Sequence, residues 1–294
     1  MPSVSQSRLA VGPPRSNPGD ERFACRRHRG PRQAMTYDVP TCVRSRFVDM
    51  ANRRLADVRA LIFDVFGTLV DWRTSIAREA RDILSPLGIA IDWDAFADQW
   101  RAQYQPAMED VRSGRLPFSK LDALHRRNLD IVLSEAGLGR VDEGTRVNLN
   151  LAWHRLDAWP DVRPGLSRLR AKFLVAPCSN GNISLMVNLA RRNELLWDAI
   201  LGAELARDYK PKPEVYLTAA AAFDCKPGET MMVAAHSSDL AAAAAIGLRT
   251  AFIARPDEHG RGLGERAATV LVDVSAANLM DLADALHCPT FPES

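Results

Sequence analysis

An aspartate follows a short apolar run near residue 60, at a place where it could act as a nucleophile. Residues 58–63 are mostly apolar, Asp64 comes next, and Gly67 and Thr68 follow. A near-continuous apolar run of this length is typical of a buried parallel strand, and glycine lets the backbone turn sharply after it. Because open α/β sheets bind ligands at the carboxyl ends of their strands, Asp64 is a candidate catalytic group. An aspartate that only starts a turn is the competing interpretation.

The residues after this strand favour one kind of chemistry. The sequence Asp-Val-Phe-Gly-Thr-Leu-Val-Asp, residues 64–71, resembles the first motif of the haloacid dehalogenase superfamily. The resemblance implies that Asp64 is the nucleophile, with the Thr68 hydroxyl beside it. In the phosphatase branch, a second aspartate two positions later protonates the leaving alkoxide, but this chain has Phe66 there. A halide needs no proton to leave, so Phe66 favours cleavage of a carbon–halogen bond.

A second motif follows the apolar run 173–178 and consists of Ser179 and Asn180. The resemblance implies that Ser179 helps to hold the substrate carboxylate, together with backbone amides near Val65 and Phe66. It also implies that the Asn180 amide assists the departing halide. Serine and asparagine are good helix caps as well, so both residues could cap the helix predicted next.

A third motif, Asp-Tyr-Lys-Pro-Lys-Pro, spans residues 208–213. The resemblance implies that Lys210, which directly follows the tyrosine, holds the nucleophile ionised and oriented. Lys212 is a competing choice. Tyr216, six residues after Lys210, matches a tyrosine of the substrate pocket.

A fourth motif follows the apolar run 230–235 and contains His236 and Asp239. The resemblance implies that Asp239 is the acid of this motif. L-2-haloacid dehalogenases carry a serine and an asparagine where this chain has Ala234 and His236, and those residues help to place the hydrolytic water. His236 could accept a proton from that water, because imidazole titrates near neutral pH. A structural histidine that caps the next helix is the alternative.

Between about Trp72 and Pro160 the apolar spacing changes to that of amphipathic helices. A helical insert directly after the first strand resembles the mobile cap of the superfamily, which excludes water from the site. Within it, Trp100-Arg101 resembles the Trp-Arg pair of L-2-haloacid dehalogenases, which implies that the Arg101 guanidinium receives the halide. An exposed arginine beside a core tryptophan is the alternative. Lys120 is expected on the surface, whereas phosphonate-cleaving relatives need a cap lysine in the site.

Strands and helices alternate through the rest of the chain, which predicts an α/β fold, a doubly wound parallel sheet with the helical cap inserted. The resemblance covers about residues 57–286. We expect three parts: a disordered Arg-rich extension over 1–49, the core over 50–71 and 161–294, and the cap over 72–160. A further hypothesis is that the working protein begins near Met50.

The composition narrows the classes of partner. The net charge is +2, which does not suggest nucleic acid as a bulk partner, and no apolar run is long enough to span a bilayer. The five cysteines are scattered and show no metal-ligand spacing, so a reducing cytoplasm is the simplest expectation. The expected partner is a small halogenated carboxylic acid, and a homodimer is compatible with this interpretation.

The motifs together predict hydrolytic dehalogenation of small 2-haloalkanoic acids through an aspartyl ester, with no cofactor and no metal. Lys210, Asp239 and His236 are the candidates to place or activate the hydrolytic water. One alternative is a Mg²⁺-dependent phosphatase or phosphonatase, in which Asp64 and Asp239 would share a cation. A non-catalytic binding protein that kept the fold is the other.

Overall fold

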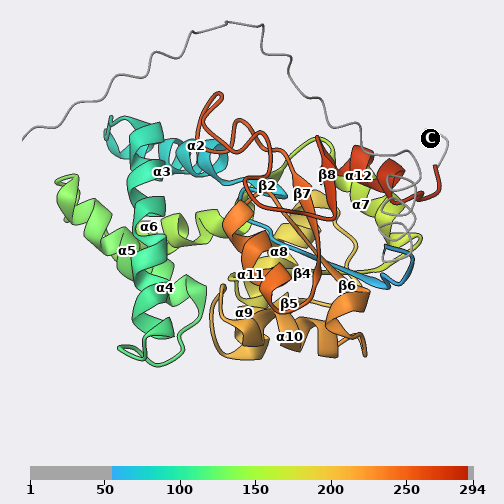
Figure 1. Ribbon diagram of the computed structural model, residues 1–294. Coiled ribbons are helices and arrows are strands. Elements are labelled where there is room, and N and C mark those ends of the chain that lie inside the picture. The colour runs from blue at the N-terminus through green and yellow to red at the C-terminus, as the bar shows by residue number, and fades with distance from the viewer. Residues whose placement is uncertain (1–54, 291–294) are drawn as a thin grey trace, which may run out of the picture. The chain divides into compact units, whose positions relative to one another are not determined.

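A six-stranded parallel sheet forms the centre of the protein (Figure 1). The structure, a computed structural model, describes residues 55–290; the predictions for residues 1–49 and for a start near Met50 lie outside that range. The strand order is β5-β4-β1-β6-β7-β8. The strands are β1 (Ala60–Phe63), β4 (Leu174–Ser179), β5 (Leu201–Gly202), β6 (Thr230–Ala234), β7 (Arg249–Ile253) and β8 (Val274–Ala276).

Strand β1 lies in the interior of the sheet and pairs with β4 on one side and β6 on the other. Its four residues are completely buried, as the apolar run predicts for a strand covered on both faces. The pairing continues past the strand, because Asp64 N donates to the Val233 carbonyl at 3.0 Å. The backbone of the predicted nucleophile is therefore fixed by a neighbouring strand.

Helices cover both faces of the sheet, which makes it doubly wound as predicted. Leu61 and Phe63 face a core that includes residues of α7 (Val162–Arg170), α8 (Ile183–Asn193) and α12 (Leu279–Ala285). Ile62 points to the opposite face and packs in a second core with α10 (Pro213–Ala221) and α11 (Ser237–Ala245). This alternation is the two-residue period of a strand.

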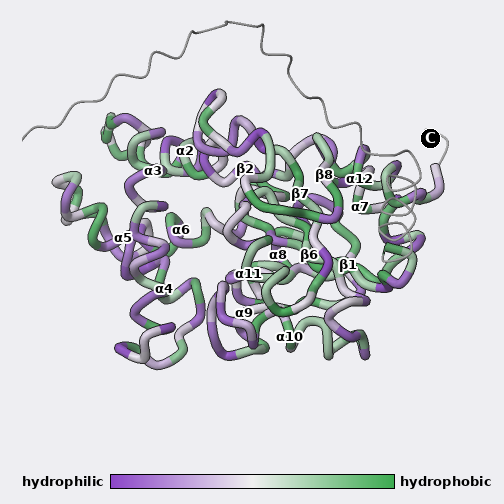
Figure 2. The backbone as a smooth tube through the Cα atoms, viewed as in Figure 1, coloured by the Kyte–Doolittle hydropathy of each residue, from purple (hydrophilic) through white to green (hydrophobic). Residues whose placement is uncertain are grey.

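The inserted segment is helical, as its sequence predicts. It contains α2 (Trp72–Leu84), α3 (Trp93–Ala102), α4 (Tyr104–Arg112), α5 (Leu121–Glu135) and α6 (Glu143–Asn150), with short 3₁₀ turns at Ser85–Leu87 and Leu151–Arg155. Hydrophobic and hydrophilic stretches alternate along these helices (Figure 2), as expected where one side packs and the other meets water. The chain enters and leaves through an antiparallel pair, β2 (Val70–Asp71) and β3 (Asp157–Ala158).

Trp100 connects the inserted helices to one another. It is 1% exposed, and its indole N–H donates to the His125 carbonyl on α5 at 3.0 Å. The division into core 50–71 plus 161–294 and cap 72–160 stays a prediction.

Candidate active site

The sequence-predicted residues meet at the carboxyl edge of the sheet. Asp64 follows β1, Asn180 follows β4, and Asp239 lies in the first turn of α11 after β6. Arg101, from α3, closes the same space from the inserted segment. Together these groups line a cavity of about 540 Å³; its wall includes Asp64, Phe66, Arg101, Tyr104, Asn180, Lys210, His236, Asp239 and Glu258.

The Asp64 carboxylate is held by three side chains. Lys210 Nζ donates to Oδ1 at 2.8 Å, the Thr68 hydroxyl donates to Oδ2 at 2.8 Å, and His236 Nδ1 lies 3.1 Å from Oδ2. Burial by itself would raise the pKa of Asp64. The charges of Lys210 and His236 and their hydrogen bonds outweigh this and lower the pKa far below its usual range. Asp64 is therefore ionised at any pH near neutrality.

Thr68 and Lys210 occupy the places that the sequence predicts for them. Thr68 is buried, and its hydroxyl also accepts from Ala235 N at 2.9 Å, so it joins the first motif to the fourth. Lys210 is 7% exposed, and its ammonium bridges Asp64 and Asp239, with 2.5 Å to Asp239 Oδ2. The competing Lys212 instead sits at the start of α10.

Tyr216 lies outside the cavity wall, although the resemblance places it in the substrate pocket. It is completely buried on α10, and its hydroxyl donates to Asp239 Oδ1. This hydrogen bond holds the phenol against the fourth motif. In this structure Tyr216 orients Asp239 and does not face the cavity.

Ser179 and Asn180 differ in where their side chains point. Ser179 is completely buried and accepts a hydrogen bond from Gly181 N at 3.0 Å, and it does not line the cavity. The hydroxyl closes the turn after β4 by accepting that bond and keeps its own hydrogen to donate, so its contact with a substrate carboxylate stays a prediction. Asn180 does line the cavity, and its Oδ1 accepts from Lys210 N at 2.9 Å. That bond leaves the Asn180 NH₂ group as a donor.

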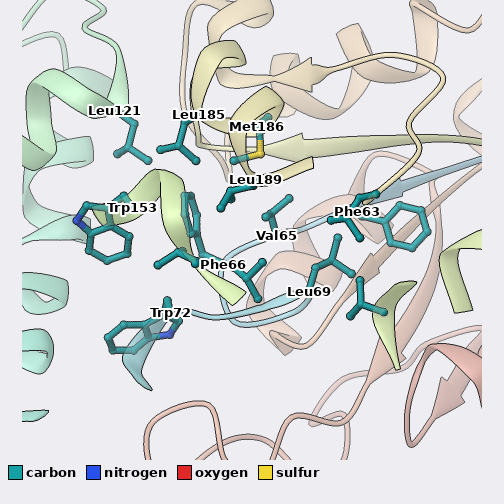
Figure 3. Packing of buried hydrophobic residues seen from close by; sticks show 14 of the residues in the cluster. Phe63, Val65, Phe66, Leu69, Trp72, Leu121, Trp153, Leu185, Met186 and Leu189 are labelled. Carbon is teal, nitrogen blue, oxygen red and sulfur yellow. The ribbon is translucent and has the colours of Figure 1, made fainter. Parts of the chain in front are cut away.

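Val65 and Phe66 follow the nucleophile but contribute differently. The Val65 carbonyl accepts from Leu69 N and Val70 N, which closes the turn, and Val65 does not line the cavity. The Phe66 ring does line it, and packs edge-on against Trp153 with ring centroids 5.8 Å apart (Figure 3). An aromatic ring therefore stands where a phosphatase has its second aspartate.

Arg101 is a cation without a counter-charge among the described residues. Its guanidinium carbon lies 4.0 Å from the Tyr104 ring centroid, 5.2 Å from that of Trp72 and 5.8 Å from that of Phe66. One terminal nitrogen is buried without a hydrogen-bond partner. A buried donor left unpaired costs free energy, so this geometry suits a guanidinium that awaits an anion. The alternative of an exposed surface arginine is wrong.

Aromatic residues pack in a cluster behind Phe66, whose ring lies beside Arg101. His125 stacks on Trp153 with ring centroids 4.2 Å apart, and Trp100 lies edge-on to the same indole. Burial lowers the pKa of His125 to about 3, so its ring is neutral. The buried ring cluster behind Phe66 is therefore uncharged, which strengthens electrostatic interactions near it.

His236 does not cap the helix that it precedes. It stands at the first position before α11 but makes no side-chain capping bond; the Ser237 backbone N–H is satisfied by Glu265 instead. Its ring lies between two carboxylates, with Nε2 2.9 Å from Glu258 Oε2. The expectation of a purely capping histidine is wrong, because both ring nitrogens face acids.

Glu258 is the residue that the sequence analysis missed. It is 2% exposed, lines the cavity, and accepts from Trp72 Nε1 at 3.1 Å. It lies in a polar loop without periodicity, after β7, so no pattern marks it. Gly67, whose missing side chain makes room for the Glu258 carboxylate, does not identify that partner in the sequence.

Within residues 55–290, no group of three or more His, Cys, Asp or Glu side chains is arranged to hold a metal ion. Positive charge between Asp64 and Asp239 comes from the Lys210 ammonium. Lys120 is exposed and pairs with Glu204 at 2.7 Å, so it stays out of the cavity as expected. No helix of the described part is long and apolar enough to cross a membrane.

Comparisons with known proteins agree with this geometry. The chain is 32% identical over 210 residues to (S)-2-haloacid dehalogenase 1 of Pseudomonas sp. (strain CBS-3), a match that covers 69% of this chain and 88% of that one. Among solved structures, the defluorinating L-2-haloacid dehalogenase Rha0230 is 47% identical, with a TM-score of 0.76 and coverage of 78% and 95%. The L-2-haloacid dehalogenase PA0810 is 45% identical, with a TM-score of 0.75 and coverage of 78% and 99%.

A family model for haloacid dehalogenase-like hydrolases matches residues 58–247, a range that contains every predicted motif. The same family is indicated by the order of the motifs, the parallel sheet, the inserted helices and the similar proteins. The chain belongs to the haloacid dehalogenase-like hydrolases.

Proposed function

We propose that this protein hydrolyses small 2-haloalkanoic acids to 2-hydroxy acids through an ester on Asp64. One observation carries the proposal: an ionised carboxylate and an unpaired, partly buried guanidinium, Arg101, line the same small cavity. A nucleophile and a receptor for an expelled anion are what carbon–halogen cleavage requires. The relatives that carry dehalogenase names support the same substrate class.

In the first half-reaction, Asp64 attacks the carbon that bears the halogen. The halide departs on the opposite side toward Arg101 and the Asn180 amide, and both can donate to an anion. Attack from the back of the carbon–halogen bond inverts the configuration at C2. Lys210 holds the carboxylate in position, since its ammonium is tied to Asp64 and Asp239.

In the second half-reaction, water attacks the ester carbonyl and restores Asp64. Lys210 and Asp239 are the groups proposed to place that water. The substrate carboxylate is assigned to backbone N–H groups near Val65 and Phe66 and to the Ser179 hydroxyl, which accepts from Gly181 N and keeps its own hydrogen to donate.

The metal-dependent phosphatase alternative is disfavoured by Phe66, which lines the cavity and packs on Trp153. A carbon ring cannot protonate an alkoxide. Turnover of haloacids should persist after dialysis against a chelator, and phosphate esters should not be hydrolysed with added Mg²⁺. Hydrolysis of phosphate esters in the presence of Mg²⁺ would instead favour the phosphatase alternative.

A cytoplasmic location and a homodimer are further proposals. The described cysteines Cys178, Cys225 and Cys288 are free thiols, which suits a reducing compartment. Sedimentation of the purified protein measures its oligomeric state.

The direct test is halide release from chloroacetate, bromoacetate, fluoroacetate and both enantiomers of 2-chloropropionate. We expect release by the wild type, an inverted 2-hydroxy acid as product, and loss of at least roughly 10⁴-fold in Asp64→Asn. Wild-type protein that releases no halide from any of these acids would refute the proposal.

A further inference from the structure

Glu258 is a buried acid held in place by groups from three parts of the chain. Its carboxylate accepts from Trp72 Nε1, and the loop that carries it begins at Arg255. Arg255 donates to the Thr68 carbonyl at 2.8 Å and forms a two-pronged pair with Asp161, also at 2.8 Å. Because a buried carboxylate is costly unless it is paired, such anchoring indicates a role for the charge.

The turn after the nucleophile is shaped to admit this carboxylate. A Cβ atom on Gly67 would lie 2.0 Å from Glu258 Oε1, and Gly67 has a φ of +87°. Only glycine combines that conformation with the space needed. Glu258 therefore lies directly against the turn that carries Asp64.

His236 joins the two acids. Its Nδ1 faces Asp64 Oδ2 at 3.1 Å, and its Nε2 faces both oxygens of Glu258, at 3.0 and 2.9 Å. An imidazole with a carboxylate on one nitrogen and the reacting group on the other is the arrangement that orients a base and stabilises its protonated form.

Asp239 is poorly placed to serve as that base. One of its oxygens accepts from Lys210 Nζ and the other from the Tyr216 hydroxyl. The pKa of Lys210 lies well above its ordinary value: burial alone would lower it, and the charges of Asp239 and Asp64 outweigh burial. The ammonium thus stays protonated and keeps Asp239 occupied.

We propose that His236 is the base that activates water for hydrolysis of the Asp64 ester, and that Glu258 is its positioning residue. The inference rests on the proposed function, because only that chemistry forms such an ester. It also implies a fixed order of steps, because His236 can act as a base only after Asp64 has formed the ester.

The protons balance in this sequence. Attack by Asp64 turns its carboxylate into a neutral ester, and the carbon–halogen electron pair leaves with the halide. His236 then gives its Nδ1 proton to solvent, which is the one proton that the net reaction releases. Neutral Nδ1 next takes a proton from water while the oxygen bonds to the ester carbonyl carbon. When the ester bond breaks, the alkoxide takes the remaining proton, and Asp64 is again a carboxylate beside a protonated His236.

The electrostatic surroundings of His236 fit this order. Burial lowers its pKa, but hydrogen bonds to Asp64 and Glu258 and their charges outweigh burial and raise the pKa to about 10. His259 lies on the same loop as Glu258, Arg101 faces the cavity from the inserted helices, and Lys210 and Asp239 line the same cavity. Ester formation removes one of the two carboxylates that raise the pKa of His236, so the ring loses its proton more easily in the intermediate.

The test separates the two half-reactions by rapid quench of the full-length protein with bromoacetate. Halide reports the first step, and the intact mass of the protein reports the ester. His236→Asn and Glu258→Gln are compared with the wild type. Glu265→Gln is the matched control, because this acid lies on the same loop and contacts Ser237 but not the imidazole.

We expect His236→Asn and Glu258→Gln to release one halide per site, with a much smaller loss of rate in this step than in hydrolysis, and then to accumulate ester. Hydrolysis should slow by roughly 10²- to 10⁴-fold in His236→Asn, the range of general-base catalysis, and by less in Glu258→Gln. The wild-type hydrolysis rate should rise with pH to a plateau. Glu258→Gln should shift that inflection to lower pH, and His236→Asn should abolish it.

Four outcomes would contradict the dyad or the proposed function. Unchanged ester hydrolysis in both variants, or an unchanged pH profile in Glu258→Gln, would overturn the dyad while leaving the ester mechanism intact. Equal slowing in Glu265→Gln would assign the effect to the loop and also overturn it. Absence of any halide release by the wild type would instead refute the proposed function.

Discussion

The two walls of the cavity carry charge in opposite ways. On the sheet side every charged group is paired: Lys210 bridges Asp64 and Asp239, and His236 lies between Asp64 and Glu258. On the side of the inserted helices, Arg101 rests on aromatic rings and has a buried nitrogen without a partner.

This difference indicates which charged groups are held in a fixed geometry before substrate binds and which are free to bind a ligand. Paired charges hold a fixed geometry, so the sheet side keeps the nucleophile ionised and oriented before substrate arrives. The unpaired Arg101 guanidinium has no counter-charge among the described residues before the reaction, so it can bind the anion that forms during the reaction. The charged groups on the sheet side should therefore matter for folding and activity, whereas Arg101 should matter for activity alone.

The largest effect is expected when the central cation of the paired side is removed. Lys210→Met should lower halide release by roughly 10³-fold or more, because Asp64 loses the group that orients it. It should also lower the free energy of unfolding by about 3–5 kcal/mol, since two buried carboxylates lose their partner. Denaturant unfolding and a halide-release assay measure the two effects. A variant as stable as the wild type would contradict the claim that the paired charges on the sheet side stabilise the fold.

Arg101→Met should separate activity from stability. We expect halide release to fall by roughly 10²- to 10³-fold, as when one preorganised donor to a developing anion is lost. The free energy of unfolding should change by less than about 1 kcal/mol, since the lost contacts with aromatic rings are offset by removal of an unpaired buried donor. Arg101→Lys, which keeps the charge without the planar fork, should give intermediate activity; wild-type activity in Arg101→Met would contradict the halide site.

Gly67→Ala tests how closely the Glu258 loop is fitted to the nucleophile turn. The new methyl group would meet the Glu258 carboxylate, and the positive φ adds strain, so we expect a loss of about 1–3 kcal/mol in unfolding free energy. Gly262→Ala, at another positive φ but in contact only with the flexible Arg266 side chain, is the control. Equal losses in the two variants would mean that backbone strain alone explains the effect.

The smallest effect concerns pH. The pKa of folded His236, about 10, lies above its ordinary value of 6.5, so its contribution to stability is complete below 6.5 and is lost as the pH rises through 10. The difference in melting temperature between the wild type and His236→Gln should therefore be largest near pH 6 and shrink toward pH 10. A difference that grows with pH would show that the ring is neutral in the folded protein.

The sequence predicts those parts of the site that are local in the chain. The run ending at Asp64 is a strand because its neighbours are apolar, and the place of Lys210 follows from a short motif. The directions of side chains were harder to predict. Ser179 accepts a hydrogen bond from Gly181 N, and the Tyr216 hydroxyl donates to Asp239, and neither bond could be predicted from the apolar spacing.

Glu258 could not be predicted because its contacts are distant in sequence. It binds Trp72, 186 residues away, through a loop with neither helical nor strand periodicity. Its position depends on the Arg255–Asp161 pair and on space left by Gly67, and none of these features forms a pattern along the chain. Isolated acidic residues in polar loops are usually exposed to solvent, so the burial of Glu258 was not expected from the sequence.

The most direct test of the account is a single turnover of 2-chloropropionate in water enriched in heavy oxygen, with enzyme in excess over substrate. We predict that one heavy oxygen enters the Asp64 carboxylate, measured by mass spectrometry of the peptide that contains it, while the 2-hydroxy acid formed is unlabelled. Label in the product with none in Asp64 would mean that water attacks the substrate directly, and would contradict the central claim.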